Sequence, residues 1–249
     1  MNKDNVFSSS EFHMDVNDVL HIIYKDESGD GAILYLQGEA SDTTPEAISD
    51  PSAIDYDGNY YTSIVIGSQE WMVENLKTTH YRDGTPIPNL TLNGDWASED
   101  GTPGHDGAYC WYNNDITNSG DYGALYNWYA VTNAHELAPT GWRIPGDLDF
   151  NTLITTIGGF ANAGAYLKEI GFVHWNVPNE GAIDSYGFRV RGAGLRSSIG
   201  AFAYLKYESQ FWTTDVGFWY YSFYNSYIYG GRSVDPPQRG FSVRCMRDI

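Results

Sequence analysis

An aromatic segment near the C-terminus carries the side chains best suited to bind a ligand. Residues 217–231 have the sequence GFWYYSFYNSYIYGG, and eight of the twelve residues from Phe218 to Tyr229 are aromatic. Tyrosine offers a large, rigid contact area at low entropic cost, and serine, asparagine and glycine add adaptable hydrogen bonds, as in antibody paratopes. This composition predicts recognition of a protein or a sugar through ring contacts and hydroxyl hydrogen bonds.

The strand expected in this segment determines which rings are available. Side chains alternate between the two faces of a strand, so one set of rings is expected to pack in the core and the other to form an exposed patch. The candidate ligand-binding residues are the rings expected to be exposed and their neighbours: Phe218, Tyr220, Tyr224, Tyr227, Tyr204, Tyr207, Arg232 and Asp235. The alternative is a tyrosine-rich sheet packed on both faces or at an oligomer interface.

Residues that could support catalysis or bind a metal form no recognisable motif. The two cysteines, Cys110 and Cys245, are isolated, and the six histidines lack metal-ligand spacing such as HExxH. The two cysteines could form a disulfide or remain free thiols, and the sequence does not distinguish these two states. No catalytic residue and no cofactor are predicted. A structural calcium ion held by Asn176, Asn179, Glu180 and Asp184, or by the acidic loop 93–121, is a less favoured alternative to plain polar loops.

Charge and composition exclude other classes of partner. The 249 residues carry a formal net charge of −18, so binding to nucleic acid or to an anionic membrane is not expected. No apolar run is long enough for a transmembrane helix. The start of the chain resembles no signal peptide. The expected locations are therefore a virion, such as a phage tail, or the cell surface or exterior after removal of a leader, with an intracellular product as a further alternative.

Residues 1–50 are expected to form a small acidic module. Residues 1–57 hold 13 acidic and 2 basic residues, against 19 and 12 in the rest of the chain. Two apolar runs, in DVLHIIYKD and GAILYLQGE, are joined by ESGDG and predict a β-hairpin, which a Ser-, Thr-, Pro- and Asp-rich linker follows. A lone hairpin is marginally stable. The module is therefore expected to pair with the main domain or with copies of itself, as an attachment or oligomerisation unit.

The main domain, residues 58–249, is expected to mix strands and helices. Residues 60–76 predict two strands joined by a glycine turn. Helices are predicted in 122–137 from the spacing of Leu125, Trp128, Tyr129 and Thr132, in 144–159 with Asp147 as its cap, and in 163–171. Short strands and loops are expected from Gly187 onward. Gly141 and Gly240 are expected at tight turns or close backbone approaches. Five tryptophans are expected in the core: Trp71, Trp111, Trp128, Trp142 and Trp212.

Seven motifs, taken in order, resemble the Fibrobacter succinogenes major paralogous domain family, which is common in Bacteroidetes. They are QEWMVENL, GAYCWYNND, YGALYNWYAV, APTGWRIPGDLDFNTL, GFRVRGAGLR, FWTTD and GFSVRCMRD, spread over residues 69–248. The resemblance implies an α+β domain related to the C-type lectin-like fold, with two helices, small twisted antiparallel sheets and long loops. Family members often have cysteine where this chain has Ala138, so the usual bridge to the terminal-motif cysteine, here Cys245, is in doubt.

The C-terminal segment also resembles the variable region of proteins diversified by retroelements, in Bacteroidetes or their phages. Such proteins place their variable residues on a C-type lectin-like fold just before a fixed C-terminus. From Phe218 to Pro237, only Trp219 is a residue that adenine-directed mutagenesis of an asparagine codon cannot produce. The resemblance implies a hypervariable receptor-binding or display protein without enzymatic activity, bound to a protein or glycan receptor on a cell surface. The alternatives are a secreted protein with a fixed carbohydrate or cell-wall ligand and, third, an enzyme of the formylglycine-generating type.

Overall fold

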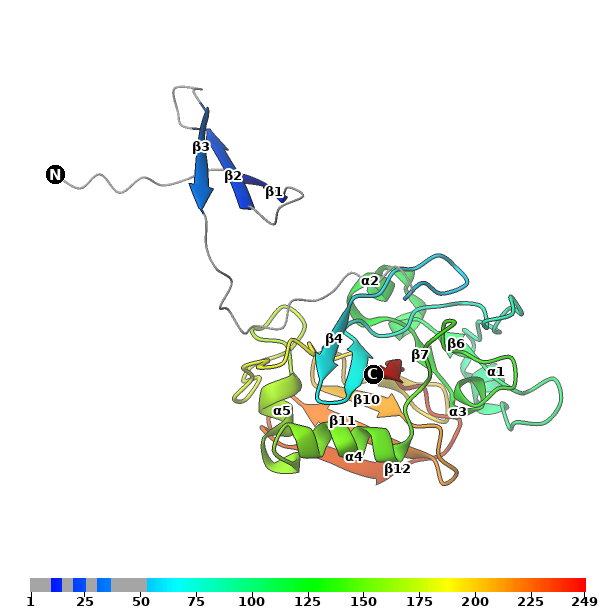
Figure 1. Cartoon of the computed structure of the whole chain (residues 1–249). Coiled ribbons are helices and arrows are strands. Elements are labelled where there is room, and N and C mark those ends of the chain that lie inside the picture. The colour runs from blue at the N-terminus through cyan, green and yellow to red at the C-terminus, as the bar shows by residue number, and fades with distance from the viewer. Residues whose placement is uncertain (1–9, 15–19, 26–30, 37–52) are drawn as a thin grey trace. The chain divides into compact units, whose positions relative to one another are not determined.

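The computed structural model divides the chain into two compact units, Met1–Thr44 and Pro45–Ile249. It describes the strands Ser10–Met14, Leu20–Lys25 and Gly31–Leu36 of the first unit, and residues 53–249 of the second (Figure 1). The predicted linker, residues 40–58, lies largely outside the described residues.

The N-terminal unit contains one antiparallel sheet of three strands in the order β1-β2-β3. Strands β2 (Leu20–Lys25) and β3 (Gly31–Leu36) pair antiparallel from Leu20 with Leu36 to Lys25 with Gly31, which confirms the predicted hairpin. The first strand, β1 (Ser10–Met14), was not predicted from the sequence, and it pairs with the other edge of β2.

The first sheet of the large unit joins its two ends. Strands β4 (Ser63–Ile66) and β5 (Gln69–Met72) form the predicted hairpin, and Gly67 at the turn has a φ of 65°, which favours glycine. The last strand, β13 (Met246–Asp248), pairs antiparallel with β5. Because a strand from residue 63 onward and one that ends at residue 248 share this sheet, the ends of the domain are held together.

Two helices follow the predicted positions. Helix α4 spans Asp147–Thr156 and helix α5 spans Phe160–Leu167, with Gly158 and Gly159 in the left-handed region between them. The prediction that Asp147 caps α4 is wrong. Gly146 is the N-cap, and its N–H donates to the Asp149 carboxylate at 2.7 Å. Asp147 is already inside the helix, where its carboxylate binds Arg232.

The prediction of a helix over 122–137 is wrong. After Tyr122, residues Leu125–Tyr126 form strand β7, which pairs with β6 (Tyr109–Cys110), and only the single turn α3 (Trp128–Val131) is helical. The Asn127 side chain accepts hydrogen bonds from Ala108 N and Ala130 N, both at 3.0 Å, and so begins the turn after the strand. Tertiary pairing thus overrides the helical spacing. The other short elements are α1 (Asn93–Ala97), η1 (Tyr112–Asn114), η2 (Ile116–Asn118), α2 (Ser119–Tyr122), β8 (Leu195–Arg196) and β9 (Phe202–Ala203).

The C-terminal sheet explains why aromatic residues occupy successive positions of the aromatic segment, because hydrophobic core residues pack against both faces of this sheet. It has the order β10-β11-β12, formed by Glu208–Trp212, Trp219–Tyr224 and Gly230–Val234. Helix α4 lies against it (Figure 1). Tyr221 is on this side and stacks on Phe150 of α4 with ring centroids 4.4 Å apart. On the opposite face Tyr220 packs on Phe241 at 4.9 Å.

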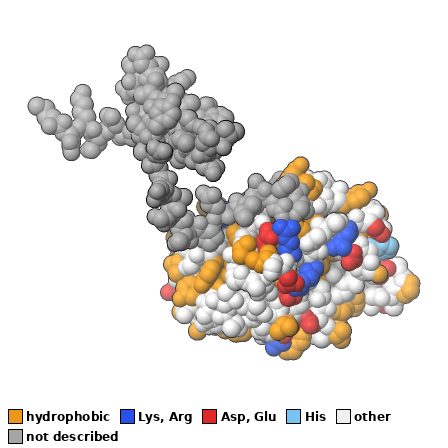
Figure 2. Space-filling model, viewed as in Figure 1, with side chains coloured by type: hydrophobic (Ala, Val, Ile, Leu, Met, Phe, Trp, Pro, Cys, Tyr) orange, Lys and Arg blue, Asp and Glu red, His pale blue; other side chains and the backbone are white. Residues whose placement is uncertain are grey.

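The large unit is therefore an α+β domain with small antiparallel sheets. Trp71, Trp111, Trp142 and Trp212 are buried as predicted, and Trp128 is half-buried. Gly141 has a φ of 83°, and a Cβ at Gly240 would lie 2.9 Å from the Trp96 ring, as expected for a close approach. Most of the surface visible in Figure 2 is uncharged. In the described part of the chain, no helix has the length and hydropathy needed to cross a membrane.

Candidate ligand-binding site

An open groove lies beside the C-terminal sheet and has a volume of about 600 Å³. Three separate segments form it: the turn before β10, the loop between β11 and β12, and the adjoining ends of these strands. Its lining is dominated by tyrosine and small polar side chains: Tyr204, Tyr207, Glu208, Ser222, Tyr224, Asn225, Ser226, Tyr227, Tyr229, Gly231, Arg232 and Ser233.

Four tyrosines of the groove expose large parts of their side chains. The exposed fractions are 54% for Tyr204, 51% for Tyr207, 44% for Tyr227 and 43% for Tyr229. Tyr227 and Tyr229 stack with centroids 4.7 Å apart, and Tyr224 meets the Tyr227 ring edge-on at 5.7 Å. These mutual contacts restrict the rings before any ligand arrives, which lowers the entropic cost of binding.

A buried lysine holds the loop that carries the stacked rings. Lys168, directly after α5, is fully buried. Its Nζ donates to the carbonyl oxygens of Tyr224 and Tyr227, both at 2.9 Å, and of Glu180 at 3.1 Å. Burial lowers the pKa of Lys168 to about 8. The ammonium therefore fixes both ends of the turn between Tyr224 and Tyr227.

Asn225 connects the two tyrosine-bearing loops of the groove. Its backbone N–H donates to Tyr207 O at 2.9 Å, and its side-chain amide donates to Asn176 O and Val177 O. The Tyr204 turn is closed by hydrogen bonds from the N–H groups of Tyr207 and Glu208 to Tyr204 O. Tyr204 itself has a φ of 65°, which is uncommon for a residue other than glycine.

The structure brings five of the eight candidate residues together in this groove: Tyr204, Tyr207, Tyr224, Tyr227 and Arg232. Arg232 is already engaged. Its guanidinium pairs with the Asp147 carboxylate, and it lies 3.8 Å from the centroid of the Trp219 ring. Tyr224 is half-buried, so it supports the exposed rings from the strand end.

The other three candidates lie outside the groove. The expectation that Phe218 and Tyr220 are exposed is wrong, because both are half-buried against the main core cluster. Phe218 meets Trp128 edge-on at 4.9 Å. Asp235 pairs with Arg239 at 2.6 Å. These side chains stabilise the domain beside the site.

Sequence reasoning missed Tyr229 and Glu208. Tyr229 lies two residues after Tyr227, so the aromatic composition of residues 217–231 was a signal that could have identified it. No sequence signal indicated Glu208. This residue enters β10 opposite Tyr224, and burial raises the pKa of its carboxyl group. Its Oε2 accepts a hydrogen bond from Gln210 Nε2 at 2.7 Å. Glu208 is thus the acidic group of the groove.

A glycine inside α5 sets the position of the tyrosine loop. A Cβ on Gly164 would lie 2.8 Å from Tyr229 O and 2.9 Å from Ile228 O. Alanine normally favours a helix by about 1 kcal/mol over glycine. We nevertheless expect Gly164→Ala to lower the free energy of unfolding by about 1–3 kcal/mol, because backbone atoms must move. Denaturant unfolding measures this.

The matched control is Gly120→Ala in helix α2, where no heavy atom lies within 4 Å of the new Cβ. This variant is expected to keep or raise the free energy of unfolding. Equal stabilisation by both substitutions would contradict the close approach of α5 to the tyrosine loop.

The alternative sites considered from the sequence are occupied by structural contacts. Asn179 donates to Glu169 O and Gly171 O, and the Asp184 carboxylate accepts from Arg189 N. Among residues 53–249 and the described strands, no group of three or more His, Cys, Asp or Glu side chains is arranged to hold a metal ion. Cys110 and Cys245 are free, buried and in different core clusters.

The comparisons with known proteins agree with the sequence motifs. The model of the Fibrobacter succinogenes major domain matches residues 64–247, which is most of the 249-residue chain. No curated protein and no solved structure matched it. The matched range includes all the strands and helices that build the groove. The chain belongs to the Fibrobacter succinogenes major domain family.

Proposed function

We propose that this protein recognises a ligand through the tyrosine groove and that binding, without catalysis, is its function. The observation that carries the proposal is the convergence of four exposed tyrosines from separate loops on one groove. Ser222, Ser226, Ser233 and Glu208 supply hydrogen-bonding groups between the rings. Such a surface suits a protein or glycan receptor on a cell surface, because rings stack on sugar faces and also anchor protein interfaces.

We assign the domain to the C-type lectin-like fold, in which loops of the C-terminal half carry the ligand face. Support comes from the two helices α4 and α5, from the sheet that joins the two ends of the domain, and from the groove between residues 204 and 233. The acidic N-terminal sheet would serve as the attachment or oligomerisation unit.

The groove residues also agree with diversification by a retroelement. All twelve lining residues fall between Tyr204 and Ser233, in the segment that would vary, and the following segment GFSVRC, residues 240–245, is buried. A fixed framework with variable exposed side chains is the arrangement that a display protein requires, whether on a phage tail or on a cell. Deep sequencing of the 3′ end of the gene in one population should show substitutions concentrated in the codons of the groove residues.

The thiols are poorly suited to the formylglycine-generating alternative. Burial raises the pKa of the Cys110 thiol to about 12, and it also raises the pKa of the Cys245 thiol. A nucleophilic or metal-binding cysteine needs an accessible thiolate, and these environments disfavour it. This chemistry favours a binding protein over an enzyme of that type.

Binding of the labelled full-length chain to a glycan array and to intact bacterial cells tests the proposal. Saturable binding to at least one of these targets is expected, and it should be lost when the groove tyrosines are replaced. Binding that survives their replacement would overturn the proposal. A glycan signal shared by natural variants would indicate a fixed carbohydrate ligand, whereas variant-specific binding to cells would indicate a diversified receptor-binding surface.

A further inference from the structure

A second, much smaller cavity of about 50 Å³ lies in another part of the large unit. It shares no lining residue with the tyrosine groove. Four cationic side chains line it: Lys77, Arg189, Arg191 and Arg244. Residues 53–249 contain twelve lysines and arginines in total, so a third of them meet at this one cavity in a strongly acidic protein.

Arg244 is the unusual member because it is buried and binds no carboxylate directly among the described residues. Its side chain is 1% exposed. Nε and Nη2 donate to Asn75 Oδ1 at 3.2 and 2.7 Å, and Nη1 donates to Phe188 O. A guanidinium has five N–H donors, so two remain for another acceptor. Burial lowers the pKa of Arg244 to about 9, although the charges of Glu74, Asp184 and Glu169 act to raise it.

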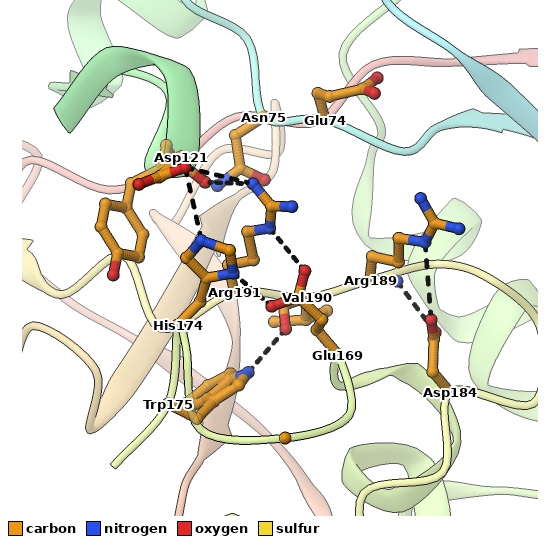
Figure 3. Close-up of polar contacts among 12 residues, drawn as sticks. Glu74, Asn75, Asp121, Glu169, His174, Trp175, Asp184, Arg189, Val190 and Arg191 are labelled. Carbon is orange, nitrogen blue, oxygen red and sulfur yellow. Dashed lines mark hydrogen bonds and ion pairs between the residues drawn. The ribbon is translucent and has the colours of Figure 1, made fainter. Parts of the chain in front are cut away.

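Two carboxylates, Glu74 and Asp121, also line the cavity, and Figure 3 shows them with Glu169 and Asp184 near Arg189 and Arg191. Arg191 pairs with Glu169 at 2.9 Å and with Asp121 at 3.8 Å, and Arg189 reaches Asp184 only at 4.0 Å. Both Glu74 oxygens accept hydrogen bonds from Thr62, at 2.8 and 2.9 Å. Among the described residues, neither Arg244 nor Lys77 forms an ion pair within 4.0 Å.

The size of the cavity limits what can enter. A group the size of a water molecule needs about 10–15 Å³ of cavity volume, so this cavity has room for about four such groups. That is enough for the oxygens of one phosphate or sulfate, or for a carboxylate, and too little for a nucleotide or a sugar ring. Planar guanidinium groups bind these anions in fork geometry.

We propose that this cavity is a binding site for a small oxyanion, held by the lining cations Lys77, Arg189, Arg191 and Arg244. The anion is either free in solution or the charged group of a small molecule whose remainder stays outside. This inference is independent of the function of the tyrosine groove.

Isothermal titration of the full-length protein with inorganic phosphate, sulfate and acetate at constant ionic strength tests the site. Saturable binding of at least one anion is expected, and Lys77→Gln and Arg189→Gln should each weaken it by about tenfold, since each removes a charged donor. Neither side chain is buried, so both variants should fold. The matched control is Lys206→Gln, which makes the same charge change outside the cavity.

Binding of phosphate and sulfate alone would indicate a tetrahedral anion, and binding of acetate a carboxylate-bearing ligand. Absence of saturable binding by all three anions would overturn the proposal. Binding weakened equally by Lys206→Gln would also overturn it, because the effect would then come from the overall charge of the protein.

Discussion

Replacement of Tyr204, Tyr207 and Tyr227 together by alanine is expected to abolish ligand binding and to leave the fold intact. An aromatic anchor at the centre of an interface contributes about 2 kcal/mol or more to binding. This is about thirtyfold in affinity per ring, so loss of three rings moves any ordinary affinity beyond detection. All three side chains are more than 40% exposed, so little buried surface is lost from the domain. Titration of the target found on the array or on cells measures the effect.

The control for this prediction is Tyr60→Ala. Tyr60 is 72% exposed and lies outside the groove, so its loss removes a similar ring without touching the site. Thermal unfolding should be nearly unchanged for both proteins. Sedimentation of the wild type and the triple variant tests whether the tyrosines form an interface between copies of this chain. If the wild type is an oligomer and the triple variant is a monomer, they do, and the ligand-binding proposal is wrong.

The second large effect is expected at Lys168. The variant Lys168→Met keeps the length and apolar part of the side chain but removes the donor to three buried carbonyls. A hydrogen bond from a charged group contributes about 1.5–3 kcal/mol. Relief of the cost of burying the cation offsets part of the loss. We expect the free energy of unfolding to fall by about 2–4 kcal/mol, together with much weaker ligand binding because Tyr227 is no longer held.

The same lysine gives a pH dependence with a definite sign. Burial lowers the pKa of Lys168 from its usual 10.5 to about 8 in the folded protein. Between these values the unfolded chain keeps the proton and the folded protein releases it, so the free energy of unfolding contributed by this group rises with pH. The stability difference between wild type and Lys168→Met should therefore grow from pH 8 to pH 10.

The matched control is Lys206→Met, which replaces a lysine that lies outside the groove lining. This substitution is expected to change the free energy of unfolding by less than about 0.5 kcal/mol. It should leave the pH dependence of that free energy unchanged. Equal effects of the two substitutions on stability would show that the Lys168 side chain does not hold the tyrosine loop. A pH-independent difference for Lys168→Met would instead show that the pKa of Lys168 is not lowered in the folded protein.

Local sequence determined several elements of this protein. Two strand-forming runs on either side of Gly67 predicted the β4–β5 hairpin, and apolar runs bounded by glycines predicted α4 and α5. The order of the tryptophan- and glycine-containing motifs identified the family, because each motif fixes a core contact or a turn. The composition of residues 217–231 also located the part of the chain that carries most of the groove.

Tertiary structure alone decided which aromatic rings are exposed. Strand periodicity separates Tyr220 from Tyr221, but it cannot say that Phe241 covers one face and Phe150 the other. Both partners come from segments far away in sequence, and burial depends on them. The exposed tyrosines therefore come mainly from the loops beyond the sheet.

The same reason explains the other residues that sequence reasoning did not find. Lys168 at the end of a helix is ordinarily a solvent-exposed side chain, and it is buried here only because the carbonyls of a distant loop surround its ammonium group. Arg244 lies in a short terminal motif, yet Asn75 and Phe188 define its environment. Local patterns specify strands, turns and helices. The environment of a buried charge is set by contacts between segments that lie far apart in the sequence.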